Sequence, residues 1–292
     1  MAPAASGPDS AVCWDFAASA NFVGRHRMEQ LSLWQIVVLA VLQGATEFLP
    51  VSSSGHLVIA AAFLTSEGST AGLDIGELNI VLHGGTLLSI LVYYWRRIWR
   101  LVGQDRRTLG LLVLGTIPAV VIGVPLKKLA GDTVLANPLL AGALLPVTGL
   151  FLLLAQGKPG SDRYQDLSYG KTFLIGLSQA IAILPGLSRS GATITAGSRL
   201  GLSPDSAATF SFLLAIPAIG GACVLQALSG IGQVATPWWH LLIGAGVAFA
   251  AGLVSLVWLI HWIQRGRLHY FAWWCIPVGI LVVIWQLATI SG

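Results

Sequence analysis

The chain alternates between long apolar runs and short polar or basic segments, which is typical of a helical protein that crosses a membrane several times. A helix needs about 20 mostly apolar residues to cross a bilayer. Six runs approach that length, at 78–95, 109–126, 138–156, 207–228, 239–263 and 271–290. The predicted fold class is an all-α polytopic membrane protein with about six transmembrane helices, and with loops at 96–107, 127–137, 157–170 and 264–269.

Two more apolar stretches are interrupted by polar residues. The segment QGATEFLPVSSSGH, residues 43–56, divides the first, and LPGLSRSGAT, residues 184–193, divides the second. The limbs on either side, 31–42 with 57–64 and 172–184 with 191–200, are too short to cross a bilayer. Irregular backbone is tolerated at membrane depth only where protein or water surrounds it, so each stretch predicts a re-entrant helical hairpin.

The two interrupted stretches resemble each other. Three pairs of residues lie 136 positions apart, namely Gln43 and Gln179, Ser52 and Ser188, and Ser54 and Ser190. If the arginine-rich loop at 96–107 lies in the cytoplasm, the first hairpin enters from outside and the second from the cytoplasm, although a lysine pair at 127–128 then lies outside. We therefore expect an inverted repeat, with halves of roughly 28–126 and 138–292 and a site at the membrane midplane.

Composition supports a single membrane domain. Of 292 residues, 55% are hydrophobic and 10% are charged, whereas soluble domains carry about 25% charged residues. The net charge of +4 lies mostly in short loops, so we expect a lipid bilayer and no nucleic acid as partner. Residues 28–292 form the expected domain. Residues 1–27 are either a disordered extension or precede a biological start at Met28.

Charged groups inside an apolar chain predict a functional site, because uncompensated burial of such groups costs several kcal/mol. Arg189 offers a fork of five donors that suits phosphate or carboxylate. Glu47 could pair with Arg189, hold a divalent cation or transfer a proton. His56 could act in proton transfer. We expect these three residues, Glu47, His56 and Arg189, to meet.

Hydroxyl-bearing residues and glycine accompany them. A helix end broken by glycine and serine can point backbone N–H groups at an anion, although such hydroxyls also bond back to their own backbone. Among the hydroxyl-bearing residues, Ser53 and Ser188 are the preferred candidates for a functional role. His83 is expected at the edge of the site. The remaining candidate substrate-binding residues are Gln43, Ser52, Ser54, Gln179, Gly186, Ser190 and Thr193. A soluble phosphate ester has no need of a site at the midplane, so the expected substrate is a lipid phosphate.

From about Met28 to its C-terminus, the chain closely resembles bacterial undecaprenyl-pyrophosphate phosphatases of the bacitracin-resistance type. The likeness is carried by the two segments 43–56 and 184–193 and the spacing between them. It implies hydrolysis of undecaprenyl pyrophosphate, which recycles the lipid carrier of peptidoglycan synthesis. It also implies a multi-pass protein of the bacterial inner membrane whose site opens to the periplasmic face.

The resemblance also implies roles for individual residues. Glu47 would be the essential acid and a ligand of Mg²⁺ or Ca²⁺, Arg189 would bind pyrophosphate, and Ser53 would be the candidate nucleophile. His56 or water are the alternative attacking groups. The family motif often begins with glutamate where this chain has Gln43, a poorer metal ligand, so either Glu47 suffices or the substrate's phosphates hold most of the ion.

Two other functions are considered. A transporter or flippase of a polyprenyl phosphate carrier stays open as the alternative, since inverted repeats with broken helices are common in transporters. A phosphatidic-acid type of phosphatase is excluded because the chain has no Arg-Pro dipeptide, and Thr195 and Arg199 stand where that type has histidine and aspartate. The oligomeric state stays open, with a homodimer as one alternative.

Overall fold

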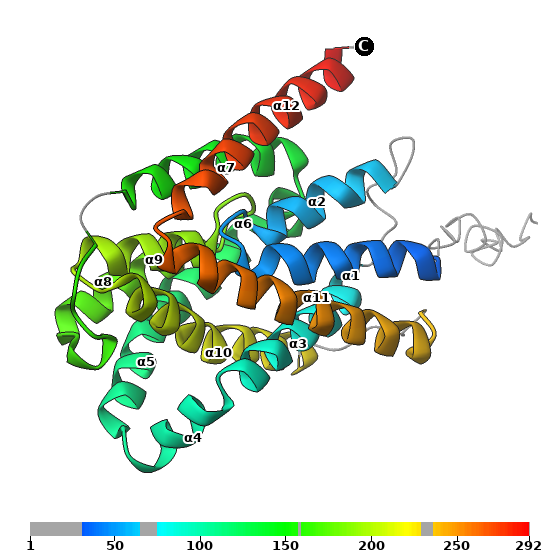
Figure 1. The fold of residues 1–292 in the computed structure, drawn as a ribbon. Coiled ribbons are helices and arrows are strands. Elements are labelled where there is room, and N and C mark those ends of the chain that lie inside the picture. Colours follow the sequence, from blue (N-terminus) through cyan, green and yellow to red (C-terminus); the bar gives the residue numbers. More distant parts are fainter. Residues whose placement is uncertain (1–30, 65–74, 157–158, 229–235, 292) are drawn as a thin grey trace, which may run out of the picture.

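The computed structural model describes residues 31–64, 75–156, 159–228 and 236–291 (Figure 1). Within these ranges the chain is almost entirely helical, and the only β-type pairing there is an isolated parallel bridge between Asp162 and Leu202. The prediction of an all-α protein is confirmed. The expectations for residues 1–27 fall outside the described ranges and stay predictions.

The helices that follow the expected spans agree closely with them. They are α3 (Ile75–Tyr93), α5 (Arg106–Pro118), α7 (Pro138–Leu154), α10 (Pro204–Leu228), α11 (Trp238–Gln264) and α12 (Ala272–Ser291). In the described chain, four helical stretches are long and apolar enough to cross a membrane: Arg106–Gly131, Pro204–Leu225, Trp238–Gln264 and Leu268–Ile290. A fifth is added if α3 and the helix after it count as one bent span. At 17 residues α7 is shorter, so the sixth span stays a prediction.

Two segments expected as loops are helical instead. The basic segment after α3 forms α4 (Trp95–Gly103), at 74° to α3. It is amphipathic, with Leu101 buried and Trp99 79% exposed, so the arginines lie on a helix that packs on one side only. Past α5 the chain continues through a π-helical turn, η2 (Ala119–Gly123), into α6 (Val124–Leu135), where lysine, leucine and alanine favour a helix.

The shorter connections contain single helical turns. The segment 157–170 includes a 3₁₀ turn, η3 (Tyr164–Asp166), and the connection between α11 and α12 contains another, η4 (Leu268–Phe271). The first lies within the loop expected at 157–170, whereas the second begins in the loop expected at 264–269 and reaches the expected span at Phe271; both remain connections between longer helices.

Each interrupted stretch forms two helices joined by a short break. The first pair is α1 (Leu33–Phe48) and α2 (Ser53–Leu64), and the second is α8 (Tyr169–Ile181) and α9 (Arg189–Arg199). Ser52 Oγ accepts the Gly55 N–H at 3.3 Å, and Ser188 Oγ accepts the Gly191 N–H at 3.1 Å. The same serine cap therefore begins α2 and α9. The inverted repeat and the re-entrant course of both pairs stay predictions.

Close contacts between helices hold α1 in place. Helices α1 and α3 both pack against α11 (Figure 1). A Cβ atom on Gly44 would lie 2.6 Å from the Ala248 carbonyl oxygen, so only glycine permits this approach. Ser255 donates to the Gly44 carbonyl at 2.9 Å. Small residues and interhelical hydrogen bonds are the usual means of helix association in lipid, where burial of apolar surface gives little driving force.

Candidate functional site

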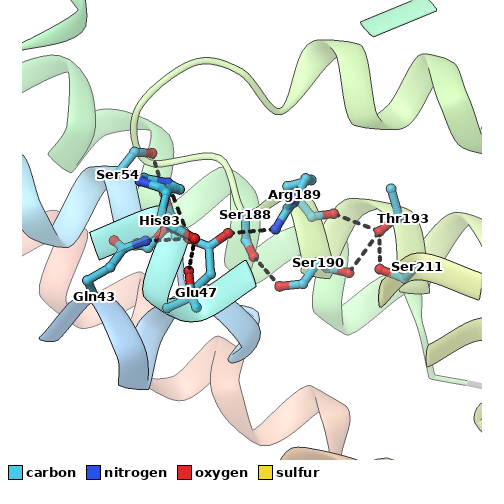
Figure 2. Close-up of polar contacts among 12 residues, drawn as sticks. Gln43, Glu47, Ser54, His83, Ser188, Arg189, Ser190, Thr193 and Ser211 are labelled. Atoms are coloured by element: carbon cyan, nitrogen blue, oxygen red, sulfur yellow. Dashed lines mark hydrogen bonds and ion pairs between the residues drawn. The ribbon is translucent and has the colours of Figure 1, made fainter. Parts of the chain in front are cut away.

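Glu47 is the central acid of the site. It lies in the last turn of α1, and its side chain is 5% exposed. Gln43, one turn earlier on the same face, donates to Glu47 Oε2 at 2.9 Å, and the Ser53 hydroxyl donates to the same oxygen at 2.6 Å (Figure 2). Because a carboxylate has about four acceptor positions, these bonds compensate part of its burial and leave Oε1 for a cation.

Arg189 supplies that cation from the second interrupted stretch. It is the first residue of α9, and its Nη2 donates to Glu47 Oε1 at 2.6 Å (Figure 2). The Arg189 side chain is 19% exposed. Its other guanidinium N–H groups have no acceptor within the described ranges, so they are free to bind the oxygens of an anion. The two polar segments identified from the sequence thus meet through this pair.

The two breaks also bond to each other. The Gly186 N–H donates to Ser52 Oγ at 3.1 Å. Gly186 has φ +91°, and a Cβ atom there would lie 2.3 Å from the Ala141 carbonyl oxygen, so glycine is required. Thr148 of α7 donates to the Gly186 carbonyl at 2.7 Å and accepts the Ser188 N–H at 2.9 Å. These bonds fix the break that leads into Arg189.

The N-termini of α2 and α9 therefore come together beside the ion pair. In α2, the N–H groups of Gly55 and His56 bond to Ser52. In α9, those of Gly191 and Ala192 bond to Ser188. The N–H groups before them, at Ser53, Ser54, Arg189 and Ser190, have no acceptor in the part of the chain that the structure describes. Two helix N-termini with free donors and a guanidinium favour an anion.

Other predicted residues brace this arrangement without contacting Glu47. Ser188 and Ser190 bond through their hydroxyls at 3.1 Å, and Ser190 also donates to the Leu49 carbonyl at 3.4 Å. Thr193 donates back to the Arg189 carbonyl at 2.8 Å and also bonds to Ser211 of α10 (Figure 2). The Thr193 hydroxyl therefore bonds to the backbone of its own helix, which is the alternative that the sequence left open for such hydroxyls.

Gln179 and Ser54 are placed differently. Gln179 is 2% exposed, and both atoms of its amide are buried without a hydrogen-bond partner. Ser54 contacts Ser52 Oγ at 3.4 Å. Neither makes a polar contact with Glu47, so their predicted substrate-binding roles stay predictions.

The histidine beside Glu47 is His83. Its Nε2 lies 3.6 Å from Glu47 Oε2 (Figure 2). Its Nδ1 lies 2.8 Å from the Asn79 carbonyl. His56 instead bonds to the Ser52 carbonyl and to Trp274 of α12. The structure therefore joins Glu47 to Arg189 as expected. It places His56 in contact with Ser52 and Trp274 and not with Glu47, and the catalytic role of His56 stays a prediction.

Three residues that support the site were not singled out from the sequence. Thr148 is a lone hydroxyl in a long apolar run, so its polarity was a usable signal. Ser211 and Trp274 carry no comparable signal, because serine and tryptophan recur throughout the apolar segments. Ser211 and Trp274 reach the site through contacts with residues distant in the sequence, and the periodicity of apolar residues does not predict such contacts.

The donor set fits a divalent ion only in part. No group of three or more His, Cys, Asp or Glu residues that could hold a metal occurs among the described residues. Gln43 Oε1, however, is buried without a partner beside Glu47. Mg²⁺ is commonly held by one or two carboxylates together with substrate phosphates. Glu47 and Gln43 Oε1 therefore fit an ion shared with a phosphorylated substrate, and they do not form a closed cage.

Comparisons with known proteins identify the family of this chain. Residues 36–281 match the model of the family described as bacitracin resistance protein BacA. An undecaprenyl-diphosphatase of Rhodopirellula baltica is 52% identical over 259 residues, which cover 87% of this chain and 98% of the relative. One from Pelotomaculum thermopropionicum is 38% identical over 273 residues, covering 90% of this chain and 100% of the relative. The chain thus belongs to the bacitracin resistance protein BacA family.

Proposed function

We propose that this protein hydrolyses undecaprenyl diphosphate to undecaprenyl phosphate and inorganic phosphate. The observation that carries this proposal is the contact of Arg189 and Ser53 with the two oxygens of one buried carboxylate, Glu47, at the joined N-termini of two helices. Relatives that cover most of the chain are named undecaprenyl-diphosphatase. Hydrolysis would return the lipid carrier to peptidoglycan synthesis and contribute to bacitracin resistance.

The site is suited to a lipid rather than a soluble ester. The helices around it are apolar on their outer faces, with Val254 71% exposed and Trp273 72% exposed. A polyprenyl chain can remain in the bilayer while its diphosphate reaches Arg189. We place the protein in the bacterial inner membrane as a multi-pass protein, with its site open to the periplasmic face.

Binding of the diphosphate would rest on charge and on backbone donors. The free N–H groups of Arg189 would form a bidentate contact with phosphate oxygens, and the free N–H groups at the start of α2 and α9 would bind the remaining oxygens. Phosphoryl transfer depends largely on positioning and charge stabilisation. Arg189 would also neutralise charge that develops on the transferring phosphate.

Ser53 is the nucleophile that this geometry favours. Its hydroxyl already donates to Glu47 Oε2 at 2.6 Å, so Glu47 can accept the proton as Ser53 Oγ attacks the terminal phosphorus. The bond from that phosphorus to the bridging oxygen breaks, and undecaprenyl phosphate leaves. Water then attacks the phosphoserine, the bond from phosphorus to Ser53 Oγ breaks, and a proton from that water restores the serine hydroxyl as inorganic phosphate leaves. The proton that Glu47 accepted passes to the released phosphate or to solvent, which restores the carboxylate.

A divalent cation would assist as a source of charge. Glu47 and Gln43 Oε1 would hold Mg²⁺ or Ca²⁺ together with the phosphates of the substrate. When bound, the ion would neutralise negative charge on the diphosphate.

Phosphate release by purified protein in detergent tests this function. The protein is mixed with undecaprenyl diphosphate, and inorganic phosphate is measured with and without a chelator, with Ser53→Ala as the negative control. Release by the wild type alone supports the enzyme. Because transport requires two compartments, a transporter or flippase would give no release in detergent, and that result would overturn the proposal.

A further inference from the structure

His56 has both ring nitrogens engaged away from the candidate active site. Its Nδ1 lies 2.8 Å from the Ser52 carbonyl oxygen, which can only accept, so Nδ1 carries the hydrogen. Its Nε2 lies 3.0 Å from Trp274 Nε1, which can only donate, so Nε2 supplies a lone pair. The two partners therefore assign one neutral tautomer to His56. In this arrangement neither nitrogen is available to exchange a proton with substrate.

The contact between His56 and Trp274 is a bond between ring edges. The two rings are nearly parallel, with an interplanar angle of 13°, and their centroids are 6.3 Å apart. That separation agrees with an N–H···N bond in the plane of both rings. His56 is 8% exposed, whereas Trp274 is 54% exposed on the outer face of α12. A surface tryptophan thus reaches inward through its indole N–H to a buried imidazole.

The carbonyl that His56 binds belongs to a residue in an unfavourable conformation. Ser52 has φ +69°, and among the described residues it is the one non-glycine with a positive φ. Such residues persist where the surroundings over-determine them. Here the Ser52 carbonyl accepts from both the N–H and the Nδ1–H of His56, while Ser52 Oγ accepts from Gly186. Glycine would adopt this φ readily but would lose the bond to Gly186.

Helix α12 braces the same break at a second point. Cys275, next to Trp274, is 0% exposed, and its thiol lies 3.7 Å from the Pro50 carbonyl. The start of α12 therefore contacts both the break itself, at Pro50, and the first turn of α2, at His56, although α12 contributes no residue to the contacts of Glu47. Ser53 follows Ser52 directly, so the conformation of Ser52 sets the direction of the Ser53 hydroxyl.

We propose that Trp274 is a positioning residue that acts through His56. By fixing the tautomer and orientation of His56, Trp274 holds Ser52 in its left-handed conformation. Ser52 in turn directs Ser53 to Glu47 and holds the break that leads to Arg189. This inference rests on the proposed function for its kinetic consequence, while the hydrogen bond itself can be tested without substrate.

Kinetics of four variants test the positioning role. Trp274→Phe keeps an aromatic ring and removes the donor, and Trp273→Phe is the matched control, because Trp273 is the adjacent residue and is 72% exposed. We expect Trp274→Phe to lower kcat for phosphate release about tenfold with KM within about twofold, and Trp273→Phe to leave both unchanged. His56→Asn keeps a donor near the position of Nδ1, whereas His56→Ala removes it.

The histidine variants separate positioning from proton transfer. If His56 positions Ser52, His56→Asn retains activity within about tenfold of the wild type, His56→Ala loses at least about 100-fold, and Trp274→Phe adds no further loss to His56→Asn. If His56 carries a proton, Asn and Ala are equally damaging, and that result would overturn the proposal. An unchanged kcat in Trp274→Phe would overturn it as well.

An NMR measurement without substrate tests the hydrogen bond between His56 and Trp274 independently of the proposed function. Protein labelled with ¹⁵N-tryptophan gives an indole N–H signal that Trp274→Phe identifies by its loss. We expect this signal to shift in His56→Ala and to remain in place in Ser53→Ala. An indole signal unaffected by His56→Ala would refute the hydrogen bond, whatever the wild type does to undecaprenyl diphosphate.

Discussion

Replacement of Arg189 by lysine separates the charge of this residue from its shape. Lysine keeps one positive charge and can still pair with Glu47, but it lacks the planar fork. Arg189 uses Nη2 for Glu47, and among the residues that the structure describes its other guanidinium N–H groups have no acceptor. We therefore expect Arg189→Lys to preserve the fold while removing bidentate binding of the diphosphate.

The expected loss follows from the number of contacts removed. A hydrogen bond to a charged group contributes about 1.5–3 kcal/mol, so loss of a bidentate contact costs about 3–6 kcal/mol. Since about 1.4 kcal/mol corresponds to a factor of ten, kcat/KM should fall about 100- to 20 000-fold. The midpoint of thermal unfolding should change little, because the ion pair with Glu47 is retained.

The assay is phosphate release from undecaprenyl diphosphate in detergent, with unfolding followed by tryptophan fluorescence. Arg199→Lys is the matched control, because Arg199 is an exposed residue at the other end of α9. We expect Arg199→Lys to behave as the wild type. A kcat/KM for Arg189→Lys within about threefold of the wild type would refute the argument that the guanidinium fork binds the diphosphate.

Three further predictions follow from the site. Ser53→Ala should reduce turnover about 1000-fold and prevent transfer of ³²P from labelled substrate to the protein; labelled Ser53→Ala protein would identify another nucleophile. Gly186→Ala should lower the free energy of unfolding by about 2–4 kcal/mol in a denaturant titration, because of its φ and the contact with Ala141; an unchanged midpoint would contradict the tight break. EDTA should abolish phosphate release, and Mg²⁺ or Ca²⁺ should restore it. Full activity in EDTA would contradict the proposal that a divalent ion is shared with the substrate.

The sequence predicted the helices and the two interrupted stretches because apolar periodicity and Pro, Ser and Gly breaks are local signals. It placed Glu47 and Arg189 together through a single argument about buried charge, and the structure joins them. It missed the helix at Trp95–Gly103, since an arginine run has the same composition in a loop and on an amphipathic helix. It expected His56 beside Glu47, whereas the structure places His83 there, because the choice depends on packing between α1 and α3.

The central claim is that Glu47 and Arg189 act as one unit on the diphosphate. A double-mutant cycle on phosphate release tests it most directly, using Glu47→Gln, Arg189→Gln and the variant that carries both changes. Residues that act as a unit have strongly non-additive effects. We predict that each single change lowers kcat/KM at least about 100-fold. The kcat/KM of the double variant should be no more than about tenfold below that of the less active single variant. A double variant whose loss equals the product of the two single losses would contradict the account.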